Sequence, residues 1–138
     1  MRLFIDANVL VSVLNKEYPL FTHSSRILSL SAKDGFELFT SPLCLAIAFY
    51  FAEKKNKKTA FGKIKLLAQN ISIAPITSAE VKQAADNSSV KDFEDGMQYY
   101  AALNTNCKCI VTEDESDFYF SKLEVINCQN FFDKYLVS

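Results

Sequence analysis

The chain has 138 residues, of which 49% are hydrophobic and 22% are charged, and its 15 basic and 16 acidic residues give a formal net charge of −1. This is the length of one domain, so we expect a single domain over residues 1–138. With only 3 Gly and 3 Pro and no repeat, the composition excludes fibrous and disordered classes. The sequence has neither a membrane-length apolar run nor a secretory signal, which predicts a soluble, cytoplasmic protein.

The first expected element is a buried strand at residues 3–5, an apolar run that stops at Asp6. Spacing and turn signals then predict a helix from residue 9 to near Pro19, a helix from Thr22 or Ser24 to Gly35, a strand at 36–40, and helices from Pro42 through Ala52 and at 59–69. After an extended segment at 70–76 come helices from Thr77 through Ala85 and at 91–104, strands at 108–111 and 125–127, and a helix at 131–136. Strands that alternate with helices predict a three-layer α/β/α fold with a mostly parallel central sheet.

The cysteines are the first candidates for a metal site. There are four of them, Cys44, Cys107, Cys109 and Cys128, but the chain has no C-x-x-C pair and its one histidine is His23. Zinc sites usually need closely spaced Cys or His ligands. We therefore expect reduced, mostly buried thiols rather than a zinc centre.

Charge is unevenly distributed along the chain. Six lysines fall within twelve residues: Lys54, Lys55, Lys57, Lys58, Lys63 and Lys65. Seven acids fall between residues 92 and 117: Asp92, Glu94, Asp95, Glu113, Asp114, Glu115 and Asp117. A lysine cluster is more often a solvated helix end, but it would also hold a phosphate backbone beside an acidic site.

Five aspartates occupy equivalent places in three separate stretches. Asp6 follows the first strand, Asp92 and Asp95 open a helix, and Asp114 and Asp117 follow the strand at 108–111. If the two strands are neighbours, these acids converge on one crevice, where a hard cation such as Mg²⁺, with Mn²⁺ as a substitute, would neutralise them. The alternative is that the acids only cap helices and stabilise their N-termini.

The same stretches resemble the three signature blocks of the PIN domain family, most closely its VapC-type toxin branch. They are residues 4–10 (FIDANVL), 92–98 (DFEDGMQ), and 110–114 (IVTED) followed by Asp117-Phe118. The likeness spans nearly the whole chain in the family's order. It implies a parallel sheet between helices, a Mg²⁺- or Mn²⁺-dependent endoribonuclease activity on RNA, frequent homodimers and, for toxins, an antitoxin protein as partner.

The resemblance also implies roles for individual residues. By motif, Asp6, Asp95 and Asp114 match the catalytic, metal-binding acids of the family. Asn8 and Thr112 match the polar residues that support those acids. The lysines Lys54, Lys55, Lys57 and Lys58 are then candidates for contact with the RNA backbone.

The sequence departs from the family at one position. Many PIN domains carry a Glu six residues after the serine that matches Ser41, and here that residue is Ile47. The nearest acid in the same helix is Glu53, almost two turns further on. The loss leaves open whether metal binding is weakened or whether Asp92 or Asp117, accessory acids whose part varies within the family, compensates for it.

Two other functions compete with a ribonuclease. A haloacid-dehalogenase-like phosphohydrolase also begins with a strand ending in Asp, but it needs a second acid where this chain has Asn8, an amide that cannot carry a proton. The other is a PIN-like scaffold that binds RNA or protein without cutting, which Ile47 favours. Four tyrosines could serve an interface or belong to the core: Tyr18, Tyr99, Tyr119 and Tyr135.

Overall fold

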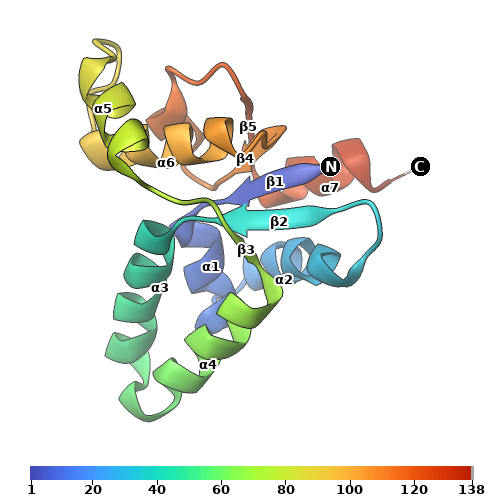
Figure 1. Cartoon of the computed structure of the whole chain (residues 1–138). Coiled ribbons are helices and arrows are strands. Elements are labelled where there is room, and N and C mark those ends of the chain that lie inside the picture. The colour runs from blue at the N-terminus through green and yellow to red at the C-terminus, as the bar shows by residue number, and fades with distance from the viewer. Residues whose placement is uncertain (138) are drawn as a thin grey trace.

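A computed structural model describes residues 1–137 of the chain, and its centre is a parallel sheet of five strands (Figure 1). The strands are β1 (Arg2–Ile5), β2 (Glu37–Thr40), β3 (Ser72–Ile73), β4 (Cys109–Val111) and β5 (Glu124–Ile126). They lie in the order β3-β2-β1-β4-β5, and every neighbouring pair is parallel. Because all five strands run the same way, their carboxyl ends share one edge of the sheet.

Strand β1 lies at the middle of the sheet and is buried on both faces. Phe4 pairs with Phe39 of β2 on one side and with Ile110 of β4 on the other. The side chains of Leu3, Phe4 and Ile5 are fully buried. A continuous apolar run is what a parallel strand covered on both faces requires, so this strand was predictable from its composition.

Helices cover both faces of the sheet. They are α1 (Ala7–Leu14), α2 (Phe21–Ser29), α3 (Pro42–Lys55), α4 (Lys57–Asn70), α5 (Ser78–Asp86), α6 (Phe93–Asn104) and α7 (Cys128–Tyr135). In Figure 1, α5 and α6 lie on one side of the sheet and α1 to α4 on the other, where α7 also packs against α2. The three-layer α/β/α prediction is confirmed. Among the described residues, no helix combines the length and the apolar character that crossing a membrane requires.

Chain connectivity places a switch point beside β1. The chain leaves β1 toward β2 and β3, and then returns over the opposite face through α5 and α6 to β4. In open parallel sheets, ligands bind at the carboxyl ends of the strands where the connections diverge in this way. The residues that follow β1 and β4 therefore flank the most favourable site in the fold.

Several predicted helix boundaries differ from the structure. Helix α1 was expected from residue 9 to near Pro19 and ends earlier, at Leu14. Helix α2 begins at Phe21 after Leu20, which is itself helical, so neither Thr22 nor Ser24 caps it, and it ends at Ser29 instead of Gly35. Helix α4 begins at Lys57, because the Asn56 side chain accepts a hydrogen bond from the backbone of Lys58. At the starts of α2 and α4 the sequence contains several residues that could begin a helix, and tertiary packing decides which of them does.

The carboxyl-terminal region also differs from the prediction. The Asn127 side chain caps α7, which therefore begins at Cys128 and not at residue 131. A 3₁₀ turn at Glu115–Phe118, which the sequence did not predict, follows β4. This turn carries Asp117 back toward the sheet, so it matters for the site.

The remaining core predictions concern sulfur and aromatic residues. All four cysteines are free and buried, as expected. Tyr99 is 3% exposed and belongs to the core, whereas Tyr18 and Tyr119 are 71% and 55% exposed. Of the four tyrosines considered for an interface, Tyr18 and Tyr119 are exposed, Tyr135 is partly buried against the core, and Tyr99 is a core residue.

A candidate active site at the carboxyl edge of the sheet

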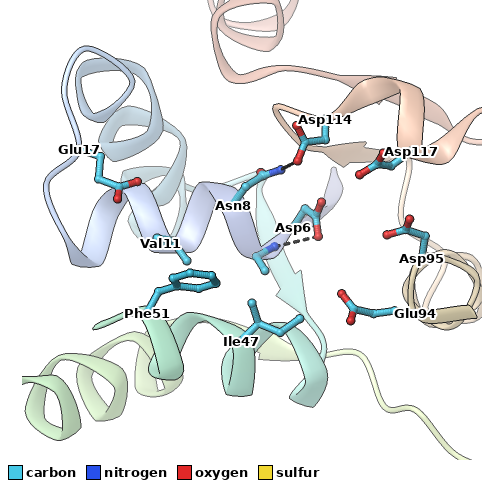
Figure 2. A pocket seen from close by; sticks show the side chains of 11 residues that line it. Asp6, Asn8, Val11, Glu17, Ile47, Phe51, Glu94, Asp95, Asp114 and Asp117 are labelled. Carbon is cyan, nitrogen blue, oxygen red and sulfur yellow. Dashed lines mark hydrogen bonds between the residues drawn. The ribbon is translucent and has the colours of Figure 1, made fainter. Parts of the chain in front are cut away.

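An open pocket of about 400 Å³ lies at the carboxyl ends of β1 and β4. Four of the predicted acids or supporting residues come to it from the segments that follow β1 and β4: Asp6, Asn8, Asp114 and Asp117. Asp95 comes from the first turn of α6 and faces them across the pocket (Figure 2). The structure thus brings the three sequence blocks together at one place, as the spacing predicted.

Hydrogen bonds hold Asp6 at the bottom of this site. Its carboxylate accepts a bond of 2.8 Å from the Ala7 backbone and another of 2.8 Å from the Thr112 hydroxyl. The Cys44 thiol donates a weaker contact of 3.7 Å. Asp6 therefore caps α1 and also lines the pocket, so capping the helix does not take its side chain away from the candidate site.

Asn8 and Thr112 form a bracket between β1 and β4. The Asn8 amide donates to Thr112 Oγ1 and to Asp114 Oδ2, both at 3.1 Å, and its oxygen accepts from the Glu113 backbone at 3.2 Å. Thr112 Oγ1 also accepts from the Asp114 backbone at 3.1 Å. Both residues therefore contact and support neighbouring acids. All the polar groups of the Asn8 side chain serve this bracket, which gives it a structural role instead of that of a second acid.

Asp92 plays a different part from the other acids. Its side chain accepts a hydrogen bond of 3.2 Å from the Asp95 backbone, so Asp92 is the N-cap of α6 and not a lining residue of the pocket. An N-cap carboxylate fixes the first turn of a helix. Asp92 therefore orients the turn that carries Asp95.

Electrostatics in the pocket oppose full ionisation. Burial, together with repulsion from four neighbouring acids, raises the pKa of Asp95 to about 7; those neighbours are Asp92, Asp117, Asp6 and Glu94. Burial also raises the pKa of Asp6, although its bonds to Thr112 and Ala7 act in the other direction. Carboxyls with raised pKa values that share a cleft are typical of functional sites.

The donor set fits a hard divalent cation. The polar groups that face the pocket are carboxylates and one amide, with neither an imidazole nor a lysine among them. Oxygen-only donors are what Mg²⁺ and Mn²⁺ prefer. Within residues 1–137, however, no three His, Cys, Asp or Glu side chains already converge as a closed metal cage. A cation held here would keep several waters or would draw the carboxylates inward.

The sequence missed two acids of the pocket. Glu94 follows Asp92 in the first turn of α6, and burial and repulsion by Asp92 and Asp6 raise its pKa. Glu17 lines the opposite end of the pocket, after α1. Glu94 belongs to residues 92–98, one of the three blocks identified in the sequence, so a signal for it was present. Glu17 had no such signal, because nothing in the sequence shows where the chain turns after α1.

Ile47 confirms that the departure from the family pattern lies in this site. It projects from α3 into the pocket, on the side opposite Asp114, and Glu94 reaches toward the same side from α6 (Figure 2). Glu53, the next acid of α3, does not line the pocket. An apolar side chain therefore lines the pocket at the position where the resemblance described above implied a Glu.

The four lysines considered for contact with RNA lie beside the pocket and do not line it. Lys54 and Lys55 end α3 within a turn of Phe51, which lines the pocket, and Lys57 and Lys58 open α4. The Lys55 ammonium donates to the Asn15 carbonyl at 2.5 Å, so this lysine fastens α3 to the end of α1. The other three are exposed and free of ion pairs within the described part of the chain.

Comparisons with known proteins agree with this geometry. Ribonuclease VapC1 of Aquifex aeolicus (strain VF5) is 29% identical over 138 residues, covering 97% of this chain and 95% of that protein. Three solved structures share the fold. VapBC2 from Rickettsia felis bound to a DNA fragment from their promoter has a TM-score of 0.71 and 17% identity, covering 92% of this chain and 98% of that one. PAE2754 from Pyrobaculum aerophilum has a TM-score of 0.67 and 16% identity, covering 97% of this chain and 88% of that one. The sarcin-ricin loop cleaving toxin VapC20 from Mycobacterium tuberculosis has a TM-score of 0.62 and 13% identity, covering 78% of this chain and 86% of that one.

A family model described as the PIN domain matches residues 2–116, a span that contains β1, the start of α6, β4 and every pocket acid except Asp117. Because the model covers most of the chain and the fold and the three acidic blocks agree with it, this chain belongs to the PIN domain family.

Proposed function

We propose that this protein is a metal-dependent endoribonuclease of the toxin type. The observation that carries the proposal is the meeting of Asp6, Asp95 and Asp114, from three separate segments, in one pocket at the switch point of a parallel sheet. Mg²⁺ or Mn²⁺ bound there would neutralise charge on a phosphodiester and activate water as a nucleophile. The relative named ribonuclease VapC1 supports an RNA substrate for this chain as well.

The chain's own residues would bind the cation and orient the acids that hold it. Asp6, Asp95 and Asp114 would hold the cation, and Glu94 and Asp117 add charge at the rim of the same pocket. Thr112 and Asn8 fix Asp6 and Asp114 relative to each other, and Asp92 fixes the turn that carries Asp95. The exposed lysines at the junction of α3 and α4 would contact the RNA backbone outside the acidic pocket.

An antitoxin partner is part of the proposal. The similarity to VapBC2, which is bound to a DNA fragment from their promoter, supports it. A homodimer remains a prediction from the family resemblance. Light scattering of the purified chain, alone and with the product of a neighbouring reading frame, tests both.

The deciding experiment is RNA cleavage with and without metal. Purified chain is incubated with structured and single-stranded RNA in Mg²⁺, in Mn²⁺ and in EDTA, beside Asp95→Asn and the matched control Asp34→Asn, which precedes β2 at the opposite edge of the sheet. We expect metal-dependent cleavage that leaves 5′-phosphate and 3′-hydroxyl ends, lost in Asp95→Asn and kept in Asp34→Asn. Cleavage that persists in EDTA or in Asp95→Asn would contradict the proposal.

A PIN scaffold that binds without cutting is the second candidate, because Ile47 places apolar atoms in the pocket. The same experiment separates the two. Calorimetric binding of Mn²⁺ together with RNA binding, but without hydrolysis of any RNA tested, would favour the scaffold.

A further inference from the structure

The pocket has an apolar side that metal binding does not require. Val11 of α1 and Ile47 and Phe51 of α3 form it, next to the acids. Ile47 and Phe51 are four residues apart, so they share one face of the helix. Figure 2 shows the Phe51 ring beside Val11, with Ile47 between that ring and the acidic side of the pocket.

Phe51 is too exposed to be explained as a core residue. Phe51 is 45% exposed, whereas two neighbouring residues of the same helix, Ala48 and Ala52, are buried. The backbone around it is nevertheless fixed, because the Phe51 carbonyl accepts from the Asn15 amide at 3.3 Å and Lys55 donates to the Asn15 carbonyl. An exposed aromatic ring on a fixed backbone beside a phosphodiester site is suited to stacking a base.

Glu17 closes this side of the pocket with an acceptor. Its backbone is held at both ends, by the bond from its amide to the Ser12 carbonyl (2.9 Å) and by the bond from the Phe21 amide to its own carbonyl (2.7 Å). Within residues 1–137 its carboxylate takes part in no hydrogen bond or ion pair. Two carboxylate oxygens can accept from two neighbouring donors at once.

We infer that Phe51, Ile47, Val11 and Glu17 form a subsite for a guanine base that neighbours the scissile phosphate of single-stranded RNA. The inference rests on the proposed ribonuclease function and adds its base preference. The base stacks on Phe51 over Ile47 and Val11. Guanine presents two adjacent donors, N1–H and N2–H₂, to a carboxylate, whereas the same edge of adenine, cytosine or uracil includes an acceptor beside a single donor group.

The substitution at position 47 belongs to the same arrangement. A Glu there would place a charge against the face of the base, between Phe51 and the acids, whereas Ile47 offers apolar contact. Ile47 therefore both removes an acid from the pocket and adds apolar surface that can bind a base.

The test uses uncharged nucleosides, so it does not depend on the metal site. Guanosine, adenosine, cytidine and uridine are titrated in turn into the full chain in EDTA, and methyl NMR signals of Ile47 and Val11 report binding. We expect guanosine to shift these signals at the lowest concentration. Phe51→Ala should weaken guanosine binding about tenfold or more, the effect of losing one stacked base, while Phe51→Tyr should retain it.

Two further variants make the result specific. Phe61→Ala is the matched control, since Phe61 is 63% exposed on α4 and does not line the pocket, and it should bind guanosine normally. Glu17→Gln should lower the preference for guanosine over the other nucleosides. Thermal unfolding of each variant checks folding, and Phe51→Leu replaces Phe51→Ala if the latter does not fold.

The outcomes separate this inference from the proposed function. RNA cleavage by the wild type without any nucleoside-induced shift, or an equal loss in Phe51→Ala and Phe61→Ala, would overturn the guanine subsite and leave the ribonuclease in place. A guanosine preference that Glu17→Gln does not change would overturn it as well. Guanosine binding that Phe51→Ala and Glu17→Gln reduce, in a chain that cuts no RNA, would support the subsite and reject the nuclease.

Discussion

The Thr112 hydroxyl donates a 2.8 Å hydrogen bond to the Asp6 carboxylate, linking the carboxyl ends of β4 and β1. The Thr112 side chain is fully buried, and the partly buried Asp6 is the acid at the bottom of the pocket. A hydrogen bond to a charged group stabilises a fold more than one between neutral groups. The position of Asp6 therefore depends on a residue more than a hundred positions away in the sequence.

Thr112→Val should remove this bond, and also the two that Thr112 Oγ1 accepts from the Asn8 amide and the Asp114 backbone, while keeping the shape of the side chain. We expect a loss of about 1.5–3 kcal/mol in the free energy of unfolding, because a partly buried carboxylate loses a donor and two neighbouring donors lose an acceptor. Mn²⁺ affinity should fall too, since Asp6 is no longer oriented. Chemical denaturation and calorimetry measure the two effects. Thr112→Ser, which keeps the hydroxyl, is the control, and equal losses in Val and Ser variants would contradict the role assigned to the hydroxyl.

The pKa of Asp95 gives a pH dependence whose sign can be worked out. Its ordinary value is 3.8, and burial with repulsion raises it to about 7 in the folded chain. Between about pH 4 and pH 7 the folded state therefore binds more protons than the unfolded state, so stability without metal should fall as pH rises through this window. Asp95→Asn should flatten the dependence and raise the melting temperature at pH 8 by a few degrees.

Metal should reverse that ranking. A cation that binds only the folded state stabilises it by mass action, about 2.7 kcal/mol at a hundredfold excess over Kd. Wild-type protein should thus gain stability on addition of Mn²⁺ at pH 8, and Asp95→Asn should gain little. Differential scanning calorimetry with and without metal provides the measurement, and an equal metal response in both proteins would argue against Asp95 as a ligand.

How far the sequence could predict this site depends on the residue. Asp6, Asp95 and Asp114 were predictable because each sits where a strand ends or a helix begins, and parallel strands bring such points together. The pairing of β1 with β4, on which the argument depended, is confirmed. Neighbouring strands in a parallel sheet can be far apart in sequence. The pairing of β1 with β4 could therefore be predicted only from the order of the family's motifs together with the hydrophobic pattern.

Glu17 and Phe51 could not be predicted as pocket residues. Glu17 follows the end of α1, close to Asn15, which forms hydrogen bonds with α3. Phe51 belonged to an almost wholly apolar run, in which hydrophobic spacing does not distinguish the face that meets the sheet from the face that meets solvent. Tertiary contacts decide both, and a single sequence does not contain them in a local pattern.

Glu94→Gln tests whether this acid compensates for Ile47. Both side chains line the pocket, and repulsion from Asp92 and Asp6 contributes to the raised pKa of Glu94. If Glu94 supports the cation, its neutralisation should weaken Mn²⁺ binding about tenfold, as loss of a supporting group does in metal sites. Titration calorimetry measures it. Glu53→Gln is the control with the same chemical change on α3, and equal affinity in the two variants would exclude Glu94 from the site.

The lysines at the junction of α3 and α4 predict a salt-dependent RNA affinity. We expect the triple variant Lys54→Ala, Lys57→Ala, Lys58→Ala to bind RNA more weakly and to reduce the slope of log K against log salt by about 0.7 for each phosphate that the variant no longer neutralises. Lys55 is left in place because it fastens α3 to Asn15. Binding is measured by fluorescence anisotropy in the Asp95→Asn background.

The control removes three lysines from the opposite edge of the sheet. Lys33, Lys108 and Lys122 precede β2, β4 and β5, so they lie at the amino ends of the strands, away from the acids. Their removal subtracts the same charge and should leave the salt slope closer to that of the parent. Equal weakening in the two triple variants would mean that only net charge matters, and the RNA-binding role of the first cluster would be discarded.

Gly96 sets how closely the acidic turn of α6 packs against the preceding segment. A Cβ at this position would lie 2.6 Å from Cγ1 of Val90, closer than side chains tolerate, and 3.1 Å from Cβ of Ala84, a tight contact. Gly96→Ala should therefore destabilise the fold by about 1–3 kcal/mol through overpacking, and it should weaken metal binding by displacing the neighbouring Asp95. Adding Val90→Ala should recover part of both losses, because it removes the nearest methyl group.

Gly62 is the matched control for this prediction. It lies inside α4 with nothing within 4 Å of an added Cβ. Because alanine favours the helix over glycine, Gly62→Ala should stabilise the fold by up to about 1 kcal/mol. Chemical denaturation of the three variants gives opposite signs for the two glycines if packing at α6 is the cause. If both substitutions stabilise the fold, the close approach of Gly96 to Val90 does not limit the position of Asp95.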